Sequence, residues 1–125
     1  MKIFKLLSFL TLFISTSIAC EAQKTEGVKV ITPEEAETAM AAEEELILID
    51  IRTPKEFDQG NIKGSKNINF FDSNFEAQML QLDKEKPLYI YCRSGARSAK
   101  ASKQLKEMGF QEIYDINGGF LNWED

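Results

Sequence analysis

The residues best suited to chemistry lie in a short loop that begins at Cys92. The apolar run 88–91 ends at this cysteine, and a helix is predicted to begin near Ser98. Gly95 permits a tight turn, and the successive backbone N–H groups of such a turn form a nest for an anion. The positive end of the following helix adds to the effect, so the loop favours a thiolate at Cys92. Cys92 is therefore the candidate catalytic nucleophile.

Two arginines in the same loop suit an anionic substrate, because guanidinium groups pair well with oxyanions. The candidate substrate-binding residues are Arg93, Ser94, Gly95, Ala96 and Arg97. The alternatives are that Cys92 is a small buried apolar residue and that the arginines form a solvated pair. A merely buried cysteine, however, does not require a glycine-containing loop with two arginines.

The composition of the 125 residues excludes several other classes of site. The chain has no histidine, which rules out Cys-His and Ser-His catalytic pairs and histidine metal sites. Cys20 and Cys92 lie too far apart in sequence for a zinc site, so neither a metal nor another cofactor is predicted. The net charge of −5 argues against nucleic acid as a partner. The length indicates one domain.

Residues 1–19 are predicted to be a secretory signal peptide, because Lys2 and Lys5 precede a short apolar stretch and then small residues. The alternative of a buried N-terminal helix or strand lacks the polar face of a surface helix. Residues 17–20 resemble the lipobox of bacterial lipoproteins, although Ser17 stands where leucine is usual. The resemblance implies a lipid on Cys20 that anchors an exported protein to a membrane of the periplasm or cell envelope. Simple cleavage that leaves Cys20 free is the alternative.

The remaining sequence alternates apolar and amphipathic segments after a polar tether over residues 20–27. Strands are predicted at residues 28–31, 46–49, 66–69, 88–91 and 112–115. Helices are predicted after Thr32-Pro33 and Thr53-Pro54, over 75–82, from about 98 to 108, and over 120–123. Continuous apolar runs suit strands buried on both faces, so residues 28–125 are predicted to form an α/β domain with a five-stranded, mostly parallel sheet flanked by helices. Asp50 and Cys92 follow different strands and should meet at one rim of the sheet.

Several motifs together resemble the single-domain rhodaneses, the thiosulfate sulfurtransferases, over residues 27–125. The segment 92–98 resembles the active-site loop of that family. The other matching residues are Asp50, Ile51, Arg52, Glu56, Phe57, Gly60, Ile62, Gly64, Asn67, Ile68, Gly118, Gly119 and Trp123. Trp123 is expected to pack in the core or a lid rather than bind a ligand. Asn61 departs from the family, which often has a structural histidine at this place.

The resemblance implies a reaction with two sulfur transfers. The Cys92 thiolate takes the outer sulfur of thiosulfate or a similar donor, and a thiol or cyanide acceptor then removes that sulfur from the Cys92 persulfide. The backbone N–H groups of residues 93–97 stabilise the persulfide. Asp50 and Arg52 are expected to shape the site; the alternative is a surface salt bridge that holds a loop.

Three other functions stay open at this point. Phosphatases and arsenate reductases of related fold have five residues between the cysteine and the arginine of their loop, whereas four separate Cys92 from Arg97. A non-catalytic rhodanese-like module, which carries sulfur or binds a partner, would have the same loop. A thiol redox protein would need a second cysteine close to Cys92 in sequence, and there is none.

Overall fold

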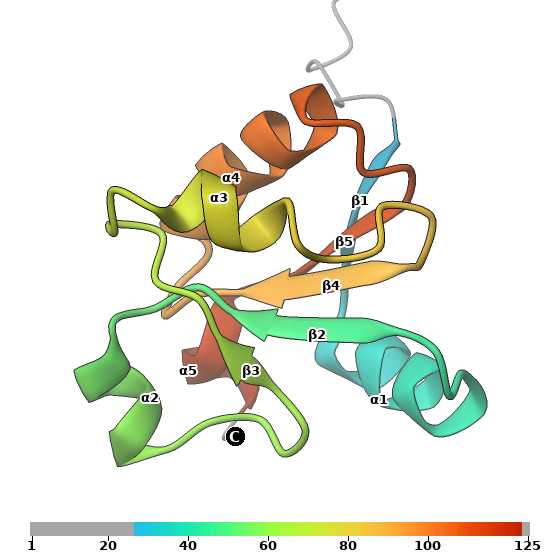
Figure 1. Cartoon of the computed structure of the whole chain (residues 1–125). Helices are drawn as coiled ribbons and strands as arrows, with labels where there is room; N and C mark the ends of the chain where they lie inside the picture. Colours follow the sequence, from blue (N-terminus) through green and yellow to red (C-terminus); the bar gives the residue numbers. More distant parts are fainter. Residues whose placement is uncertain (1–26, 124–125) are drawn as a thin grey trace, which may run out of the picture.

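The computed structural model describes residues 27–123, in which strands and helices alternate along the chain (Figure 1). The strands are β1 (Val28–Ile31), β2 (Ile47–Asp50), β3 (Lys66–Asn67), β4 (Leu88–Tyr91) and β5 (Ile113–Ile116). The helices are α1 (Pro33–Ala42), α2 (Pro54–Gln59), α3 (Phe75–Met79), α4 (Ala96–Glu107) and α5 (Gly119–Trp123). All strand pairs are parallel, in the order β1-β5-β4-β2-β3. The predicted five-stranded α/β fold is confirmed.

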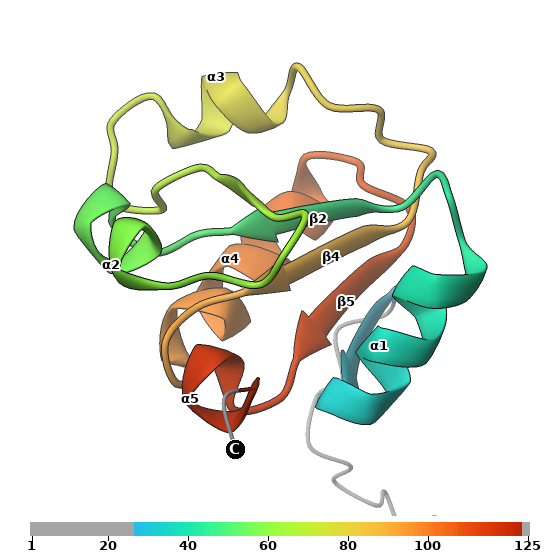
Figure 2. The same ribbon diagram turned by 90° about the horizontal axis from the view of Figure 1, so that it is seen from below.

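The sheet separates two apolar clusters, each covered by its own helices. Figures 1 and 2 show α3 and α4 on one face of the sheet and α1, α2 and α5 on the other. Strand alternation sends Ile90 to the first cluster, with Leu105 of α4, and Tyr91 to the second, which Trp123 also contacts. The central strand β4 is buried along its whole length. A parallel strand covered on both faces accounts for its continuous apolar sequence.

The structure confirms the predicted starts of α1 and α2, which side chains cap, and, to within one residue, the predicted end of α4, which a glycine follows. The Thr32 hydroxyl accepts a hydrogen bond from the N–H of Glu35 at the start of α1. Thr53 and Glu56 form a capping box at the start of α2. Gly109, with φ at +100°, follows the end of α4.

Several predicted boundaries differ from the structure by one to three residues, and the largest difference is the end of α3, at Met79 instead of residue 82. The helix predicted from about Ser98 begins at Ala96, because Gly95 caps it with a left-handed backbone instead of a side chain. Ala96 and Arg97 therefore belong to the first turn of α4 rather than to the loop. The strand predicted over 66–69 ends at Asn67, although the N–H of Ile68 still donates to the carbonyl oxygen of Asp50.

The predicted signal peptide, the predicted lipid on Cys20 and most of the tether concern residues outside the described part of the chain. The structure does not test them, and they stay predictions. Within residues 27–123, no helix combines the length and the apolar character needed to cross a membrane.

Candidate active site

The ends of β2 and β4 meet at one rim of the sheet, as predicted. Asp50, the last residue of β2, lies in register with Tyr91, the residue before Cys92. Cys92 packs with the cluster beneath α3 and α4, whereas strand alternation directs Asp50 and Tyr91 to the opposite face. The two predicted site residues therefore share the rim but approach it from different sides of the sheet.

Cys92 is 1% exposed, and backbone and hydroxyl groups surround its sulfur. The N–H of Gly95 donates to Sγ at 3.1 Å and that of Ser98 at 3.4 Å, while the Ser98 hydroxyl oxygen lies 3.5 Å from Sγ. Gly95 has φ at +107°, in the left-handed region that favours glycine, and this turn aims the amides at the sulfur. The anion-binding nest predicted from the sequence is present around Cys92.

These contacts change the acidity of the thiol in opposite directions. Burial is the largest single influence and raises the pKa of Cys92, because it disfavours the charged form. The hydrogen bond between the sulfur and the Ser98 hydroxyl lowers the pKa, as do those from the N–H groups of Ser98, Gly95 and Ser94. Together the hydrogen bonds prevail, and the pKa of Cys92 lies below the ordinary value for a thiol. The nest therefore favours the thiolate, the nucleophilic form of cysteine.

The short helix α5 fixes the two peptide groups at the start of this loop. The N–H of Phe120 donates to the carbonyl oxygen of Cys92 at 2.8 Å, and the N–H of Leu121 donates to that of Arg93 at 3.1 Å. A Cβ on Gly119 would overlap the Cys92 carbonyl oxygen and lie 2.6 Å from that of Arg93. The glycine pair noted in the sequence thus lets α5 approach the loop backbone closely enough to bond it.

Asp50 and Arg52 form a buried ion pair rather than the surface salt bridge considered as an alternative. Their side chains are 0% and 4% exposed, and Arg52 Nη2 lies 2.7 Å from Asp50 Oδ2. The same Nη2 donates to the carbonyl oxygen of Gly60 at 2.6 Å, and the guanidinium lies 4.3 Å from the ring centroid of Phe120. Arg52 therefore joins the end of β2 to α5, the helix that holds the active-site loop.

The two loop arginines have different surroundings. Arg97 makes a bidentate ion pair with Glu56 of α2, at 2.7 and 2.9 Å. The hydrogen bond from Arg97 is the main reason that the pKa of Glu56 falls to about 2. Arg93 is exposed and has no carboxylate partner among the described residues. Of the two, Arg93 is the one with its charge available to an anion.

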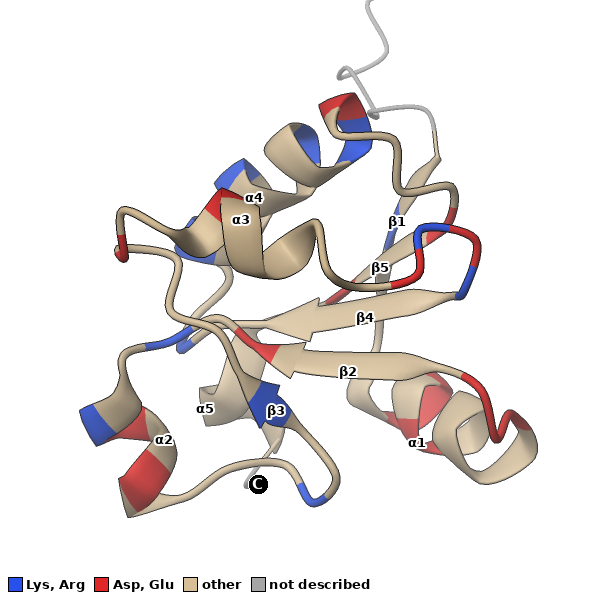
Figure 3. Ribbon diagram, viewed as in Figure 1, with Lys and Arg blue, Asp and Glu red and all other residues tan. Residues whose placement is uncertain are grey.

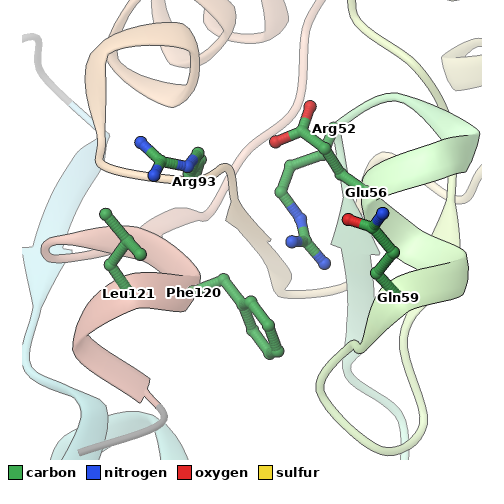
Figure 4. Close-up of a pocket in the computed structure, with 6 residues that line it drawn as sticks. All are labelled: Arg52, Glu56, Gln59, Arg93, Phe120 and Leu121. Carbon is green, nitrogen blue, oxygen red and sulfur yellow. The ribbon is translucent and has the colours of Figure 1, made fainter.

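A cavity of about 210 Å³ opens beside this loop, between α2 and α5. Figure 4 shows Arg93 and Leu121 on one side of it, facing Arg52, Glu56 and Gln59. Figure 3 shows the wider distribution of charged residues, with basic residues along α4 and acidic ones on α1 and the turn after it. The cavity itself carries both signs of charge, with Arg52 and Arg93 beside Glu56.

Comparison with known proteins identifies the family. The model of the rhodanese-like domain matches residues 32–125. The chain belongs to the rhodanese-like domain family. It is 33% identical to a thiosulfate sulfurtransferase of Pseudoalteromonas translucida over 81 residues, which covers 65% of this chain and 75% of the relative. It is also 33% identical to a sulfurtransferase of Allochromatium vinosum over 96 residues, 77% of this chain and 88% of the relative.

Solved structures agree with this assignment. The crystal structure of a rhodanese-like domain protein from Staphylococcus aureus superposes with a TM-score of 0.69 at 28% identity. The match covers 78% of this chain and 92% of that one. The resemblance found in the sequence is thus confirmed for the domain and for its fold.

Asn67, which matches the family, and Asn61, which departs from it, both hydrogen-bond to nearby backbone. The Asn67 side chain donates to the carbonyl oxygens of Asp50 and Arg52 at 3.0 and 2.8 Å, and so fixes the strand end. Asn61, at the place where the family often has histidine, donates to the carbonyl oxygen of Phe57 at 3.0 Å. This bond holds the chain against the end of α2, and it does not need the imidazole of a histidine.

Sequence reasoning did not assign Ser98, Glu56, Gln59, Phe120 and Leu121 to the site, although they contact the sulfur or line the cavity. Ser98 and Glu56 were present in the recognised motifs, and Phe120 and Leu121 directly follow the glycine pair. For Gln59 the sequence offers only its position one helical turn after Glu56. Within residues 27–123, no group of three or more acidic or cysteine side chains gathers as a metal site would require.

Proposed function

We propose that this protein is a sulfurtransferase that moves a sulfane sulfur from thiosulfate, or a similar small anionic donor, to a thiol or cyanide acceptor through a persulfide on Cys92. The observation that carries the proposal is the set of hydrogen bonds from Gly95 and Ser98 to the Cys92 sulfur. They favour a thiolate without any general base, which suits a chain that has no histidine. The sulfurtransferase names of two relatives support the same reaction class.

The first half-reaction forms one S–S bond and breaks another. The Cys92 thiolate attacks the outer sulfur of thiosulfate, the S–S bond of the donor breaks, and sulfite leaves with the bonding electron pair. The enzyme then carries a Cys92 persulfide with one negative charge. In the second half-reaction the acceptor attacks the outer sulfur, the persulfide bond breaks and the thiolate returns. Cyanide leaves as thiocyanate, and the charges balance in both steps.

The described residues offer specific support to each stage. The exposed Arg93 guanidinium at the cavity mouth attracts the sulfonate end of the donor. The amides that contact Sγ stabilise negative charge on sulfur, because preorganised backbone donors need no rearrangement as charge develops. The bonds from α5 to the loop carbonyl groups keep those amides in place.

Two assays on the full chain test this proposal. Thiosulfate is added without an acceptor, and the Cys92 peptide is examined by mass spectrometry for one added sulfur atom that cyanide removes. Steady-state formation of thiocyanate is measured in parallel for wild type, Cys92→Ser and the control Cys20→Ser. We expect the adduct and turnover in wild type and in Cys20→Ser, and neither in Cys92→Ser. Absence of both in the folded wild-type protein would favour a non-catalytic module, and hydrolysis of an aryl phosphate instead would favour a phosphatase.

We also propose that the protein is exported and anchored to the bacterial cell envelope through a lipid on Cys20. The basic start, apolar stretch and lipobox-like residues of the first 20 positions support this proposal. Metabolic labelling with a radioactive fatty acid should mark wild type and Cys92→Ser but not Cys20→Ser. Absence of label from the wild-type protein would overturn the proposed lipid anchor.

A further inference from the structure

A buried carboxyl group lies behind the active-site loop, on β5. Asp115 is 5% exposed, and its Oδ1 has no hydrogen-bond partner among the described residues. It lies in register with Ile90 of β4 and so points to the face of the sheet that α4 covers. Burial of a carboxylate oxygen without a partner is costly, and such an atom requires an explanation beyond packing.

The surroundings of Asp115 belong to the same loop and helix that hold the Cys92 sulfur. A cavity of about 290 Å³ is lined by Asp115 together with Val30, Ser94, Gly95, Ala99, Ile116, Asn117 and Gly118. The buried side of α4 above the sheet carries Ser98 and Ser102. The cavity that Asp115 lines shares no lining residue with the one that Arg93 lines.

Cys92 is the titratable group that faces this side of the sheet from the neighbouring described elements. From β1, Val30 lies in register with Asp115, while Lys29 lies in register with Tyr114 and points to the other face. From β4 the neighbours are Ile90 and then Cys92. From α4 the buried polar groups are the two serine hydroxyls and carry no charge.

The hydroxyl of Ser98 lies beside the sulfur and also lowers the pKa of the Asp115 carboxyl group. This hydroxyl lies 3.5 Å from Cys92 Sγ and donates to the carbonyl oxygen of Gly95 at 3.2 Å. Burial raises the pKa of Asp115 to about 6, and a hydrogen bond with Ser98 acts in the opposite direction. A serine hydroxyl has one proton to donate, and in this structure that proton goes to the Gly95 carbonyl oxygen. Donation to the sulfur or to the Asp115 carboxylate would therefore replace that bond.

We propose that Asp115 is a positioning residue that acts on the Cys92 sulfur through the hydroxyl of Ser98. The ionised carboxylate accepts the hydroxyl proton and withdraws it from the sulfur, which weakens the support for the thiolate. The protonated carboxyl group instead donates to the Ser98 oxygen, and the hydroxyl proton is then directed to the thiolate. A proton on Asp115 and a negative charge on Cys92 therefore favour each other. The inference takes from the proposed function only that Cys92 is the reacting nucleophile.

The first test measures the reactivity of Cys92 without any sulfur transfer. The rate of alkylation by iodoacetamide is followed from pH 4 to 9 on the full chain, with mass spectrometry of the Cys92 peptide. Asp115→Asn has a neutral side chain of the same shape that can donate to Ser98. We expect it to lower the midpoint on the order of one pH unit, as for two ionisable groups that share a hydrogen bond. Asp83→Asn removes the same charge from an exposed turn and should leave the midpoint unchanged.

The second test separates an effect through Ser98 from one through space. In a Ser98→Ala background, Asp115→Asn should shift the midpoint by much less than in wild type. An equal shift in both backgrounds, or no shift in Asp115→Asn alone, would overturn the proposal.

A third measurement on the native Asp115 covers the case in which Asp115→Asn does not fold. Carbon-13 NMR of the Asp115 carboxyl should show a lower titration midpoint in Cys92→Ser than in wild type, because linkage is reciprocal. An unchanged midpoint would contradict the proposal. None of these measurements needs turnover, so their outcome is distinguishable from a failure of the sulfurtransferase assay.

Discussion

The backbone of Phe120 is hydrogen-bonded to the backbone of Cys92, with the N–H of the first 2.8 Å from the carbonyl oxygen of the second. This bond connects the C-terminal helix α5 to the residue that ends β4. It orients the peptide plane from which the active-site loop departs. The direction of the amides that contact the sulfur therefore depends on residues late in the sequence.

Substitution of Gly119 by alanine should disturb this connection. Its Cβ would overlap the Cys92 carbonyl oxygen, and φ at +62° disfavours alanine as well. We expect a loss of about 2–4 kcal/mol in the free energy of unfolding and a higher midpoint for alkylation of Cys92. Gly64→Ala is the matched control, because Gly64 has φ at +89° but nothing within 4 Å of an added Cβ. It should lose only about 1–2 kcal/mol and leave the midpoint unchanged. Equal effects of both substitutions on Cys92 would contradict the role given to α5.

The features that were predictable from the sequence are those set by local rules. The buried strand β4 is a continuous apolar run, and the capping box of Thr53 and Glu56 marks the start of α2. The loop after Cys92 was recognisable because glycine and small residues between a strand and a helix form a nest. The start of α4 was misplaced because Gly95 caps it with backbone geometry alone, whereas Ser98 is a residue type that often caps helices.

The remaining features depend on contacts between distant parts of the chain. Arg97 was interpreted as a substrate ligand, but Glu56, 41 residues away, pairs with it. Asp115 is buried because β5 lies between β1 and β4 and is covered by α4. A charged residue type alone does not predict this burial. Neither spacing nor residue type reports which carboxylate meets which guanidinium across a sheet.

Arg93→Ala should weaken binding of the donor rather than the chemical step. Arg93 lines the cavity mouth and has no ion-pair partner in the described part of the chain, so its charge is available to thiosulfate. We expect KM for thiosulfate to rise about three- to tenfold with little change in kcat, as for loss of a uniform binding contact. Salt should also inhibit the variant less than the wild type. Lys100→Ala, which removes an exposed charge from α4, serves as the control and should leave KM nearly unchanged. A fall in kcat at constant KM would assign Arg93 to the transfer step instead.

Glu56→Gln should destabilise the protein in a manner that depends on pH. Its pKa is lowered to about 2 in the folded state, chiefly by the hydrogen bond from Arg97. A depressed carboxyl pKa stabilises the fold above the unfolded value and loses that contribution as pH falls through the folded value. The side chain is 25% exposed, so solvent screening reduces the effect to about 1 kcal/mol at pH 7. Urea unfolding should show this loss at pH 7 and only a small part of it near pH 2, and the exposed control Glu76→Gln should lose little stability at either pH. A loss that persists in full at pH 2 would indicate a packing effect.

Asp115→Asn should raise the free energy of unfolding, whereas Glu56→Gln lowers it. Burial raises the pKa of Asp115 to about 6 in the folded state, so the ionised form destabilises the fold above that pH. The penalty is complete above pH 6, declines as the pH falls towards 4, and vanishes below the unfolded value. Two pKa units correspond to about 3 kcal/mol, which is an upper bound for the gain of the variant at pH 7. Urea unfolding of both proteins at pH 7 and pH 4 measures this, and the gain should fall to a small part of its pH 7 value at pH 4. A variant that is less stable than wild type at pH 7 would show that the carboxylate has a favourable partner, and the buried charge would then need no role at Cys92.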